Sequence, residues 1–553
     1  MARRGIDSIT LEVLWSRLVA IAEESAGEII RTAFSTTIRE SRNFALVILD
    51  TKGFLIAQAV STMPSFIGAI PITARQLLKI FKPDDMKEED LILTNDPWLG
   101  TGQLQDLTSL SPIFYKKKLV AFVGITTHVT DVGGKLRSPE VREIYEEGVQ
   151  IPPCKFFTEG KIDQSLLEII RKNVRLPNQI EGDILSHRAA SQIASKRVSE
   201  MLEEYKLEHL EVVSSIILQR SENTVRDAIK KIPDGEYRFQ TLTDGYNEPL
   251  IIRVEVRVRG SSILIDFTGS SPQVDRGLNS VFNFVYAYSA YTIKCLFFPD
   301  IPNNDGNFRP ISVSAPDGSI LNPRYPAAVN GRSMVGHFIP SVIFGALHNA
   351  VPGLVQAASG SPSWSLNAAG TTLDGKPFAG NYFFHGGQGA SAKNDGQSCM
   401  SFPSNTSNTP IEILEHMVPL LVEKKSSIRD SGGSGKYRGG NGQQVVVKSL
   451  SETPILLTFI SERTKHPAYG LFGGKNGRAG KITYNGRPIN PKKQLVLAQG
   501  DRLIMEIPSG GGYGDPRERS TQLIENDIRN GVLSIEKSRK EYGTSGNLTN
   551  SDL

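Results

Sequence analysis

The sequence predicts a multidomain α+β protein with long N-terminal and central helices, mixed or antiparallel sheets and a Gly-rich, β-dominated C-terminal half. Three observations lead to this prediction. The chain has 553 residues, which is too long for one hydrophobic core, because domains usually hold about 100–200 residues. Two long stretches of the first half have the spacing of amphipathic helices. From about residue 326 onward Gly and Pro become dense between short apolar runs, which is typical of strands joined by tight turns that only Gly fits easily.

The first predicted element is one long helix over residues 6–36. Leu11, Leu14 and Leu18 recur there near helical spacing, and charged residues fill the gaps. A hairpin is predicted over residues 44–57, because its central turn holds Asp and Gly, which tolerate the required backbone angles.

Two strands are predicted next, at residues 107–115 and 119–127, separated by three lysines. A mostly helical stretch is predicted at residues 166–232, followed by three strands at residues 237–243, 250–259 and 262–267. A last helix is predicted at residues 520–530.

The chain is divided by these patterns into four regions and a tail. The regions are an N-terminal α/β region with a candidate metal hairpin (residues 1–160), a helical region (161–235), a β-rich region with a helix (236–325) and a Gly-rich β-dominated region (326–543). A flexible polar tail follows at residues 544–553.

Composition argues against several classes of partner. With 62 basic and 58 acidic residues, neither sign is in real excess, so neither a nucleic acid nor an anionic membrane is expected as partner. The three cysteines are far apart, which predicts no disulfide framework and no CxxC zinc site. No uncharged apolar stretch reaches the roughly 18 residues of a membrane span, and the N-terminus has no signal-peptide pattern. We therefore expect a soluble cytoplasmic protein.

The predicted hairpin at residues 107–127 places two possible metal ligands together. If residues 116–118 form a three-residue turn, Tyr115 lies opposite Leu119, and the same register brings Asp106 opposite His128. Residues directly opposite in an antiparallel pair project to the same face, about 5 Å apart. A carboxylate and a neutral imidazole are typical ligands of a divalent metal.

Two further polar residues flank this pair. The same register places Gln103 opposite Asp131, on the other face of the sheet, and a bulge or loop would be needed to bring Asp131 into the cluster. The structural alternative is that Asp106 caps a turn and His128 is an ordinary strand-end histidine, since the spacing is not that of an established ligand motif.

The glycine runs do not predict a nucleotide site. The segment from Gly432 to Lys436 has a Gly-rich loop followed by Lys, but Tyr437 stands where a phosphate-binding loop needs Ser or Thr for Mg²⁺. His385 precedes a Gly-rich turn and is a candidate for lining a pocket. Ser363 has no recognisable nucleophile-elbow sequence around it.

Short motifs in a fixed order run along nearly the whole chain, from about residue 9 to residue 543. They include Asn95-Asp-Pro-Trp-Leu-Gly100, His128-Val-Thr-Asp-Val-Gly-Gly134, Asp266-Phe-Thr-Gly-Ser-Ser-Pro-Gln273, Pro326-Ala-Ala-Val-Asn330 and Gly510-Gly-Gly-Tyr-Gly-Asp-Pro516. Each motif alone is modest, but their number and order are highly specific. On these motifs the chain resembles the hydantoinase B/oxoprolinase family, and within it the N-methylhydantoinase B-like subunits. The family also holds the alpha subunits of acetone carboxylase-type enzymes.

The resemblance implies a two-part enzyme. A hydantoinase A-type partner subunit would bind and hydrolyse ATP, and this B-type chain would complete the hydrolytic ring opening of a small cyclic amide, such as a hydantoin, a lactam or 5-oxoproline. A hetero-oligomer with ATP on the partner is therefore expected. In the family a divalent metal lies near a His-x-x-Asp motif and a second His, and Asp106 and His128 match those ligand positions. Asp131, in the same motif as His128, would orient that histidine or act as a catalytic base.

Three residues depart from the family pattern. Gln103 stands where the first His of His-x-x-Asp is expected, Phe66 replaces another histidine, and Asn43 replaces an aspartate. Because Gln offers only a carbonyl oxygen, a hard ion such as Mg²⁺ or Mn²⁺ is favoured over Zn²⁺. Two alternatives to the hydrolase remain open, an ATP-dependent ketone carboxylase subunit of the same fold and a catalytically degenerate scaffold subunit.

Overall fold

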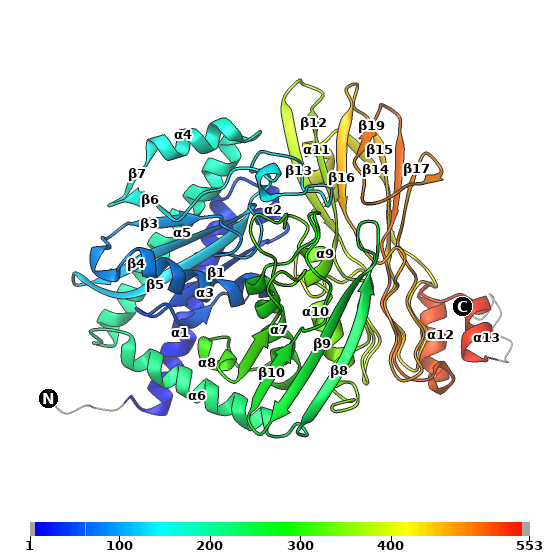
Figure 1. Cartoon of the computed structure of the whole chain (residues 1–553), viewed down its shortest axis with the longest axis horizontal. Coiled ribbons are helices and arrows are strands. Elements are labelled where there is room, and N and C mark those ends of the chain that lie inside the picture. The colour runs from blue at the N-terminus through cyan, green and yellow to red at the C-terminus, as the bar shows by residue number, and fades with distance from the viewer. Residues whose placement is uncertain (1–5, 61, 545–553) are drawn as a thin grey trace.

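The protein is described by a computed structural model over residues 6–60 and 62–544. Its N-terminal part is built on a seven-stranded antiparallel sheet (Figure 1), in the order β2-β1-β5-β4-β3-β6-β7. The strands are β1 Phe44–Leu49, β2 Leu55–Gln58, β3 Leu91–Thr94, β4 Asp106–Tyr115, β5 Lys118–His128, β6 Cys154–Thr158 and β7 Lys161–Ile162.

Helices cover both faces of this sheet. α1 (Ser8–Thr32) and α5 (Pro177–Glu204) pack together on one face, and α3 (Pro64–Ile80) packs on the other. Successive residues of β1 point into the two cores, Leu46 into the first and Val47 into the second. Because both faces of β1 are buried, its sequence is an unbroken apolar run instead of an alternating one.

The long helix predicted over residues 6–36 is present as α1, which ends four residues earlier than predicted. α1 ends at Thr32, and α2 (Thr36–Arg39) begins after an extended link. Asp183 of α5 accepts hydrogen bonds from the backbone N–H groups of Phe34 and Ser35, at 2.8 and 2.9 Å. This contact from far along the chain satisfies the backbone groups where the helix breaks, so local periodicity did not predict the break.

The β4–β5 hairpin has the predicted pairing with a different turn. Lys116 and Lys117 form a two-residue turn at φ values of 50° and 65°, one residue shorter than predicted. A register shift after Ile113 offsets that difference. Asp106 therefore faces His128, as the sequence predicted.

The stretch predicted to be mostly helical contains α5 and two more helices, α4 (Gln164–Asn173) and α6 (Glu211–Ile229). A second sheet follows in the order β11-β10-β9-β8, antiparallel except for the parallel β10–β11 pair. α10 packs on its buried face. The strands and helices of this part are β8 Gly235–Thr243, β9 Leu250–Arg259, β10 Ser262–Asp266, β11 Ile311–Ser314, α7 Phe282–Phe297, α8 Asp305–Phe308, α9 Ser333–Gly336 and α10 Ile339–Leu347.

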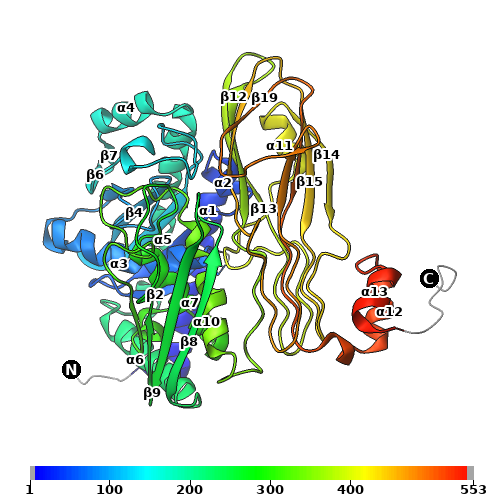
Figure 2. The ribbon, with the colours of Figure 1, turned by 45° about the vertical axis from the view of Figure 1, so that its right-hand side comes forward.

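Two more sheets stack as a sandwich over a shared apolar core, in the orders β13-β12-β16-β19 and β14-β15-β20-β17-β18. Figure 2 shows this sandwich beside the N-terminal part, with the last two helices projecting from its base. Its elements are β12 Trp364–Thr371, β13 Pro377–Phe384, α11 Ile411–Met417, β14 Leu420–Ser427, β15 Gln443–Ser449, β16 Ile455–Ile460, β17 Lys481–Tyr484, β18 Arg487–Pro488, β19 Leu495–Leu497, β20 Arg502–Glu506, α12 Thr521–Arg529 and α13 Ile535–Tyr542. Short 3-10 helices lie at Pro83–Asp85, Ile144–Glu146 and Pro516–Glu518. The helix predicted at residues 520–530 is thus confirmed.

The Gly-rich runs at residues 386–389, 432–440 and 510–512 lie side by side as extended chains at the base of the sandwich. A Cβ added to Gly387 would lie 1.7 Å from the carbonyl oxygen of Gly440, and one added to Gly510 would lie 2.0 Å from that of Gln388. The prediction of tight turns at these runs is wrong, because no glycine of these runs has the positive φ that such a turn would require. The missing side chain instead allows neighbouring backbones to approach closely and hydrogen-bond.

The four predicted regions share a hydrophobic core. One cluster of buried side chains runs from Leu91 through Ile229 and Ile265 to Tyr513 and so takes residues from every region. Within the described part of the chain, no helix is both long and apolar enough to cross a membrane. The tail predicted at residues 544–553 lies outside the described residues, apart from Thr544.

Candidate active site

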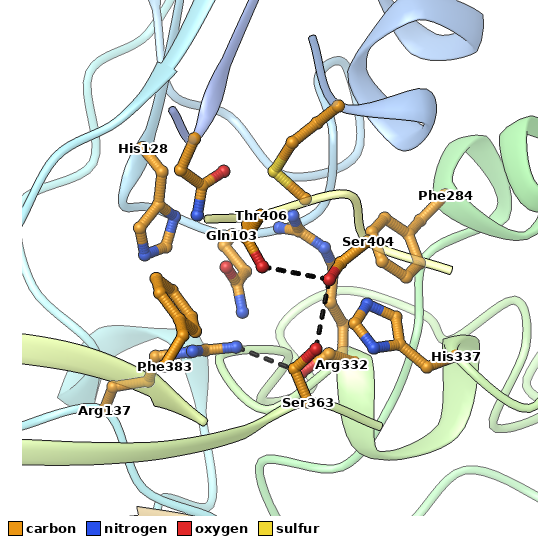
Figure 3. A pocket seen from close by; sticks show the side chains of 13 residues that line it. Gln103, His128, Arg137, Phe284, Arg332, His337, Ser363, Phe383, Ser404 and Thr406 are labelled. Atoms are coloured by element: carbon orange, nitrogen blue, oxygen red, sulfur yellow. Dashed lines mark hydrogen bonds between the residues drawn. The ribbon is translucent and has the colours of Figure 1, made fainter. Parts of the chain in front are cut away.

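A narrow pocket lies where three parts of the molecule meet, namely the ends of β4 and β5, the segment leading into α9, and the β12–β13 edge of the sandwich (Figure 3). Its free volume is about 30 Å³, close to that of one water molecule, because the side chains that line it lie near one another. The hairpin side lines the pocket with His128 and Arg137, and the α9 segment with Arg332 and His337. The sandwich and the loop after β13 add Ser363 and Ser404.

Asp106 and His128 form a hydrogen-bonded pair at the mouth of the hairpin. The Oδ1 atom of Asp106 lies 2.7 Å from Nδ1 of His128, and both side chains are buried. The Nδ1–H group donates to the carboxylate, so Nε2 has the lone pair and accepts from the Nδ2 amide of Asn381, 3.1 Å away. Burial lowers the pKa of His128 and keeps the ring neutral.

The second oxygen of Asp106 is also occupied. The hydroxyl of Thr101 donates to Oδ2, and Nη1 of Arg332 lies 2.5 Å from the same atom in an ion pair. Burial by itself would raise the pKa of Asp106, but the charge of Arg332 and the hydrogen bonds from His128 and Thr101 outweigh it and hold the pKa at about 2. Asp106 is therefore ionised at every physiological pH.

The predicted divalent metal does not fit these residues. Both oxygens of Asp106 and both ring nitrogens of His128 already have partners, and the Arg332 cation stands beside the carboxylate where a metal would bind. No group of three or more His, Cys, Asp and Glu side chains within residues 6–60 and 62–544 is arranged to hold a metal ion. The metal thus stays a prediction from the family resemblance.

Arg137 brings a second positive charge into the pocket. Its guanidinium is buried and donates to the carbonyl of Asn330 at 3.0 Å and to the hydroxyls of Ser333 and Ser365 at 3.1 and 3.3 Å. All three acceptors are neutral. Burial, together with the nearby charge of Arg332, lowers the pKa of Arg137 to about 9, which leaves it charged at neutral pH.

Glu147 holds the backbone of the segment that carries Arg332. One of its carboxyl oxygens accepts from the N–H groups of Val329 and Asn330, at 2.6 and 2.9 Å. Burial raises the pKa of Glu147 to about 8, against the opposing effects of these two N–H groups and of the Arg137 charge.

Gln103 and Asp131, which the predicted register set opposite each other, have different partners. The Gln103 amide donates to the carbonyl of Asn330 at 2.5 Å. Asp131 forms an ion pair with Arg175 at 2.6 Å and accepts a hydrogen bond from the backbone N–H of the same residue. The orienting role that we expected for Asp131 at His128 belongs to Asp106 in the structure. The catalytic role of Asp131 stays an untested prediction without support from its position.

The sandwich contributes hydroxyl groups to the opposite side of the pocket. The Oγ atoms of Ser363 and Ser404 are 3.0 Å apart, and Oγ of Ser404 is 3.1 Å from Oγ1 of Thr406 (Figure 3). Nδ1 of His385 lies 3.2 Å from Oγ of Ser363. His385, which the sequence suggested as a pocket residue, thus supports a lining residue from behind and does not line the pocket itself.

Sequence reasoning missed Arg137, Arg332 and His337. Arg332 and His337 come from a region distant in sequence from the hairpin, and their side chains reach it only through tertiary packing. Arg332 lies two residues after Pro326-Ala-Ala-Val-Asn330, one of the motifs behind the family resemblance. The closeness of Arg332 to this motif was the one sequence feature that could have pointed to it as a pocket residue.

This arrangement suits general-base chemistry beside a stabilised oxyanion. Asp106 fixes the tautomer of a neutral His128, which leaves Nε2 able to accept a proton from a water that replaces the Asn381 amide. Arg332 and Arg137 place positive charge in the same enclosed space, where an electrostatic interaction is stronger than in water.

The chain is similar to known proteins over nearly its whole length. The sequence profile of the family described as hydantoinase B/oxoprolinase matches residues 7–516. An uncharacterized protein of Methanocaldococcus jannaschii is 34% identical, over 97% of this chain and 96% of its own length. The B-type subunit of a putative D-/L-hydantoinase from Pseudomonas sp. strain NS671 is 29% identical, over 98% of this chain and 95% of its own.

Two solved structures have the same architecture. The ATP-dependent caprolactamase from Pseudomonas jessenii superimposes with a TM-score of 0.90 at 26% identity, over 98% of each chain. A nucleotide-free acetone carboxylase superimposes with a TM-score of 0.86 at 19% identity, over 98% of this chain and 80% of the other, which shows a shared fold. The predicted multidomain α+β fold is confirmed, and this chain belongs to the hydantoinase B/oxoprolinase family.

Proposed function

We propose that this chain is the B-type subunit of an ATP-dependent cyclic amide hydrolase. It would open the ring of a hydantoin, a lactam or 5-oxoproline together with an ATP-binding A-type subunit. The observation that carries the proposal is the buried Asp106–His128 pair in a pocket that also contains two arginines. The named functions of two relatives, a putative D-/L-hydantoinase and an ATP-dependent caprolactamase, support the same reaction class.

The reaction divides naturally between two subunits. An amide is a poor electrophile because its nitrogen lone pair is delocalised into the carbonyl group. Transfer of the terminal phosphoryl group of ATP to the amide oxygen removes that stabilisation and prepares the carbon for attack by water. The phosphorylated intermediate is reactive, so the two subunits must pass it on inside one complex, and we expect a stable hetero-oligomer.

This chain would carry the hydrolytic half of the reaction. His128 would take a proton at Nε2 as the water oxygen bonds to the activated carbon, and would return it to the ring nitrogen as the C–N bond breaks, while Asp106 holds the imidazole in the required tautomer. A second water would then release phosphate and leave a carboxylate. Arg332 and Arg137 would stabilise negative charge that develops on the oxygens of the intermediate.

The Gly-rich runs of this chain use their backbone N–H groups internally, which supports the proposal that ATP binds to the partner subunit. The N–H of Gly432 donates to the side-chain carbonyl of Asn441 at 2.8 Å, and the N–H of Gly433 donates to the carbonyl of Gly510 at 2.9 Å. Because these backbone donors are used inside the protein, the Gly432–Lys436 segment has few left to hold a phosphate.

Activity of the co-purified A-type and B-type subunits tests the proposal. We expect ATP-dependent ring opening of at least one cyclic amide in a panel of hydantoins, lactams and 5-oxoproline, with one ADP released per ring opened. The B-type chain by itself should hydrolyse no ATP. ATP hydrolysis by the isolated chain, or turnover restricted to a ketone plus bicarbonate, would contradict the proposal.

The fold shared with an acetone carboxylase is the observation that favours a second candidate, an ATP-dependent ketone carboxylase subunit. Assays with ketones and labelled bicarbonate separate the two reactions directly. A third candidate, a degenerate scaffold, predicts that a His128→Gln variant of the complex keeps full activity.

A further inference from the structure

The charges around the pocket do not balance. Arg137 and Arg332 are 8% and 4% exposed, and Asp106, at 2% exposed, is the carboxylate that pairs with Arg332. The single negative charge of Asp106 lies against Arg332. In the part of the chain that the structure describes, Arg137 forms no ion pair with any carboxylate.

The other ionisable groups nearby do not supply the missing negative charge. Burial lowers the pKa values of His128 and His337, the latter to about 3, so both rings are neutral. Glu147 directs one oxygen to two backbone N–H groups, and burial favours its protonated form. Among the described residues, Asp106 is thus the one carboxylate that forms an ion pair with either of these two buried arginines.

The geometry of the two arginines leaves polar groups free for a ligand. Each guanidinium nitrogen of Arg137 donates one hydrogen bond to a neutral acceptor, and each of its two terminal nitrogens has a second N–H group that can reach a ligand. The guanidinium of Arg332 lies 4.3 Å from the centre of the Phe284 ring, and its buried Nε has no hydrogen-bond partner among the described residues. Nδ1 of buried His337 is likewise without a partner there. A buried charge without a counter-charge is costly, whereas an anion that binds two guanidinium groups gains strong charge-assisted hydrogen bonds.

We propose that this pocket is an oxyanion subsite, in which Arg137 and Arg332 bind a carboxylate or phosphoryl group of the reactant. The inference rests on the proposed function and narrows its substrate class. Hydroxyl groups of Ser333, Ser363 and Ser404 surround the same space and can donate further hydrogen bonds to oxygens of the anion.

Two sources of the anion have the same chemistry and lead to different substrates. If the ring carries the anion, the chain selects a cyclic amide with a carboxylate substituent over a neutral lactam. If the anion is the phosphoryl group placed on the amide oxygen, the subsite holds the activated intermediate, and neutral and acidic rings are both accepted.

Binding to the full-length chain tests the subsite with three small probes at constant ionic strength. The probes are 5-oxoproline, its neutral counterpart 2-pyrrolidinone, and inorganic phosphate, measured by titration calorimetry. We expect either 5-oxoproline to bind at least tenfold more tightly than 2-pyrrolidinone, or phosphate to bind while both rings do not. The first result assigns the anion to the ring and the second assigns it to the phosphoryl group. Failure of both anions to bind would overturn the proposal.

Matched variants connect any binding to the pocket. Arg137→Gln should weaken anion binding at least tenfold. Arg463→Gln removes another buried arginine, whose Nε donates to the carbonyl of Ser361 outside the pocket, and should leave anion binding unchanged. Equal anion binding by the wild type and Arg137→Gln would show an adventitious ion only and overturn the proposal. If Arg137→Gln does not fold, Ser333→Ala, which removes one acceptor of Arg137 and one lining hydroxyl, replaces it and should weaken anion binding measurably.

The turnover assay keeps this inference separate from the proposed function. ATP-dependent opening of a neutral ring, together with no binding of 5-oxoproline or phosphate, would overturn the oxyanion subsite and leave the hydrolase intact. Arg137-dependent anion binding by a complex that opens no cyclic amide would support the subsite and count against the hydrolase.

Discussion

The two sides of the pocket differ in how their polar groups are fixed. On the hairpin side, Asp106, His128 and Arg332 form a chain of charged or strongly polar contacts in which each group depends on the next. On the sandwich side, Ser363 and Ser404 make hydrogen bonds with neutral groups, namely other hydroxyl groups and the ring of His385. The comparison suggests that the hairpin side supplies the charge and proton transfer, and that the sandwich side completes the enclosure and supplies adaptable hydrogen bonds.

The largest effect is expected from His128→Gln, which removes the proton acceptor and keeps a polar side chain of similar length. ATP-dependent ring opening by the reconstituted complex should fall by about 10²–10⁴-fold, the usual contribution of a general base. Assembly with the A-type subunit should be unchanged, which gel filtration checks. Full activity of this variant would remove the hairpin side from the mechanism.

Asp106→Asn should be the most destabilising substitution on the hairpin side. The variant leaves the buried Arg332 cation without its carboxylate, and loss of one partner of a buried ion pair costs about 3–5 kcal/mol. Urea unfolding measures the change. Asp131→Asn is the comparison variant. Asp131 is also buried, but its partner Arg175 is about one third exposed, so water can solvate the remaining charge and the expected cost is smaller, about 1–3 kcal/mol. Similar losses in both variants would contradict the special position of Asp106.

Glu147→Gln should change the pH dependence of stability. Burial raises the pKa of Glu147 from 4.5 to about 8 in the folded protein, so the folded state holds this proton more tightly than the unfolded state. The stability that the bound proton provides is complete below about pH 4.5 and declines as pH rises to about 8. The Gln variant cannot lose a proton and should therefore lack this decline in thermal unfolding experiments between these pH values. A decline of the same size in the variant would show that another group causes it.

A smaller effect is expected on the sandwich side. Ser404→Ala removes a hydroxyl from a network of neutral hydrogen bonds, each worth about 0.5–1.5 kcal/mol. Ring opening should fall by less than about tenfold. A loss as large as that of His128→Gln would place chemistry on this side of the pocket and break the comparison.

No effect is expected from removing metal ions. Arg332 occupies the position beside Asp106 where a metal would bind, so dialysis against a chelator should leave the melting temperature of the chain unchanged. Elemental analysis of the purified protein gives a second measurement. A lower melting temperature, restored by Mn²⁺, Mg²⁺ or Zn²⁺, would instead support the metal predicted from the family resemblance.

The hairpin side was largely predictable and the rest of the pocket was not. The antiparallel register places Asp106 opposite His128 from sequence alone, although a two-residue turn and a bulge replaced the simple turn that was predicted. Local patterns contain this information because the two strands are adjacent in the chain. They do not contain the approach of Arg332, whose segment packs so closely that a Cβ on Gly331 would lie 2.2 Å from the carbonyl oxygen of Gly277.

The break between α1 and α2 and the arrangement of the Gly-rich runs have the same explanation. Asp183 ends a helix that local periodicity would continue, and Gln388 and Gly440 hydrogen-bond through backbones far apart in sequence. Composition revealed that glycine was needed in these runs, but it did not distinguish a tight turn from close backbone packing.

The close packing of the Gly-rich runs has a consequence for biosynthesis. Backbone groups of Gly510 and Gly511 hydrogen-bond to Gly433, Gly440 and Ala358, so the base of the sandwich is complete only after the ribosome has added Gly511. The seven-stranded sheet draws its strands from the first third of the chain and can form earlier. A nascent chain that stalls before residue 510 would leave the partners of Gly510 and Gly511 unpaired, which makes this part of translation a period when the sandwich is open to aggregation or capture by chaperones.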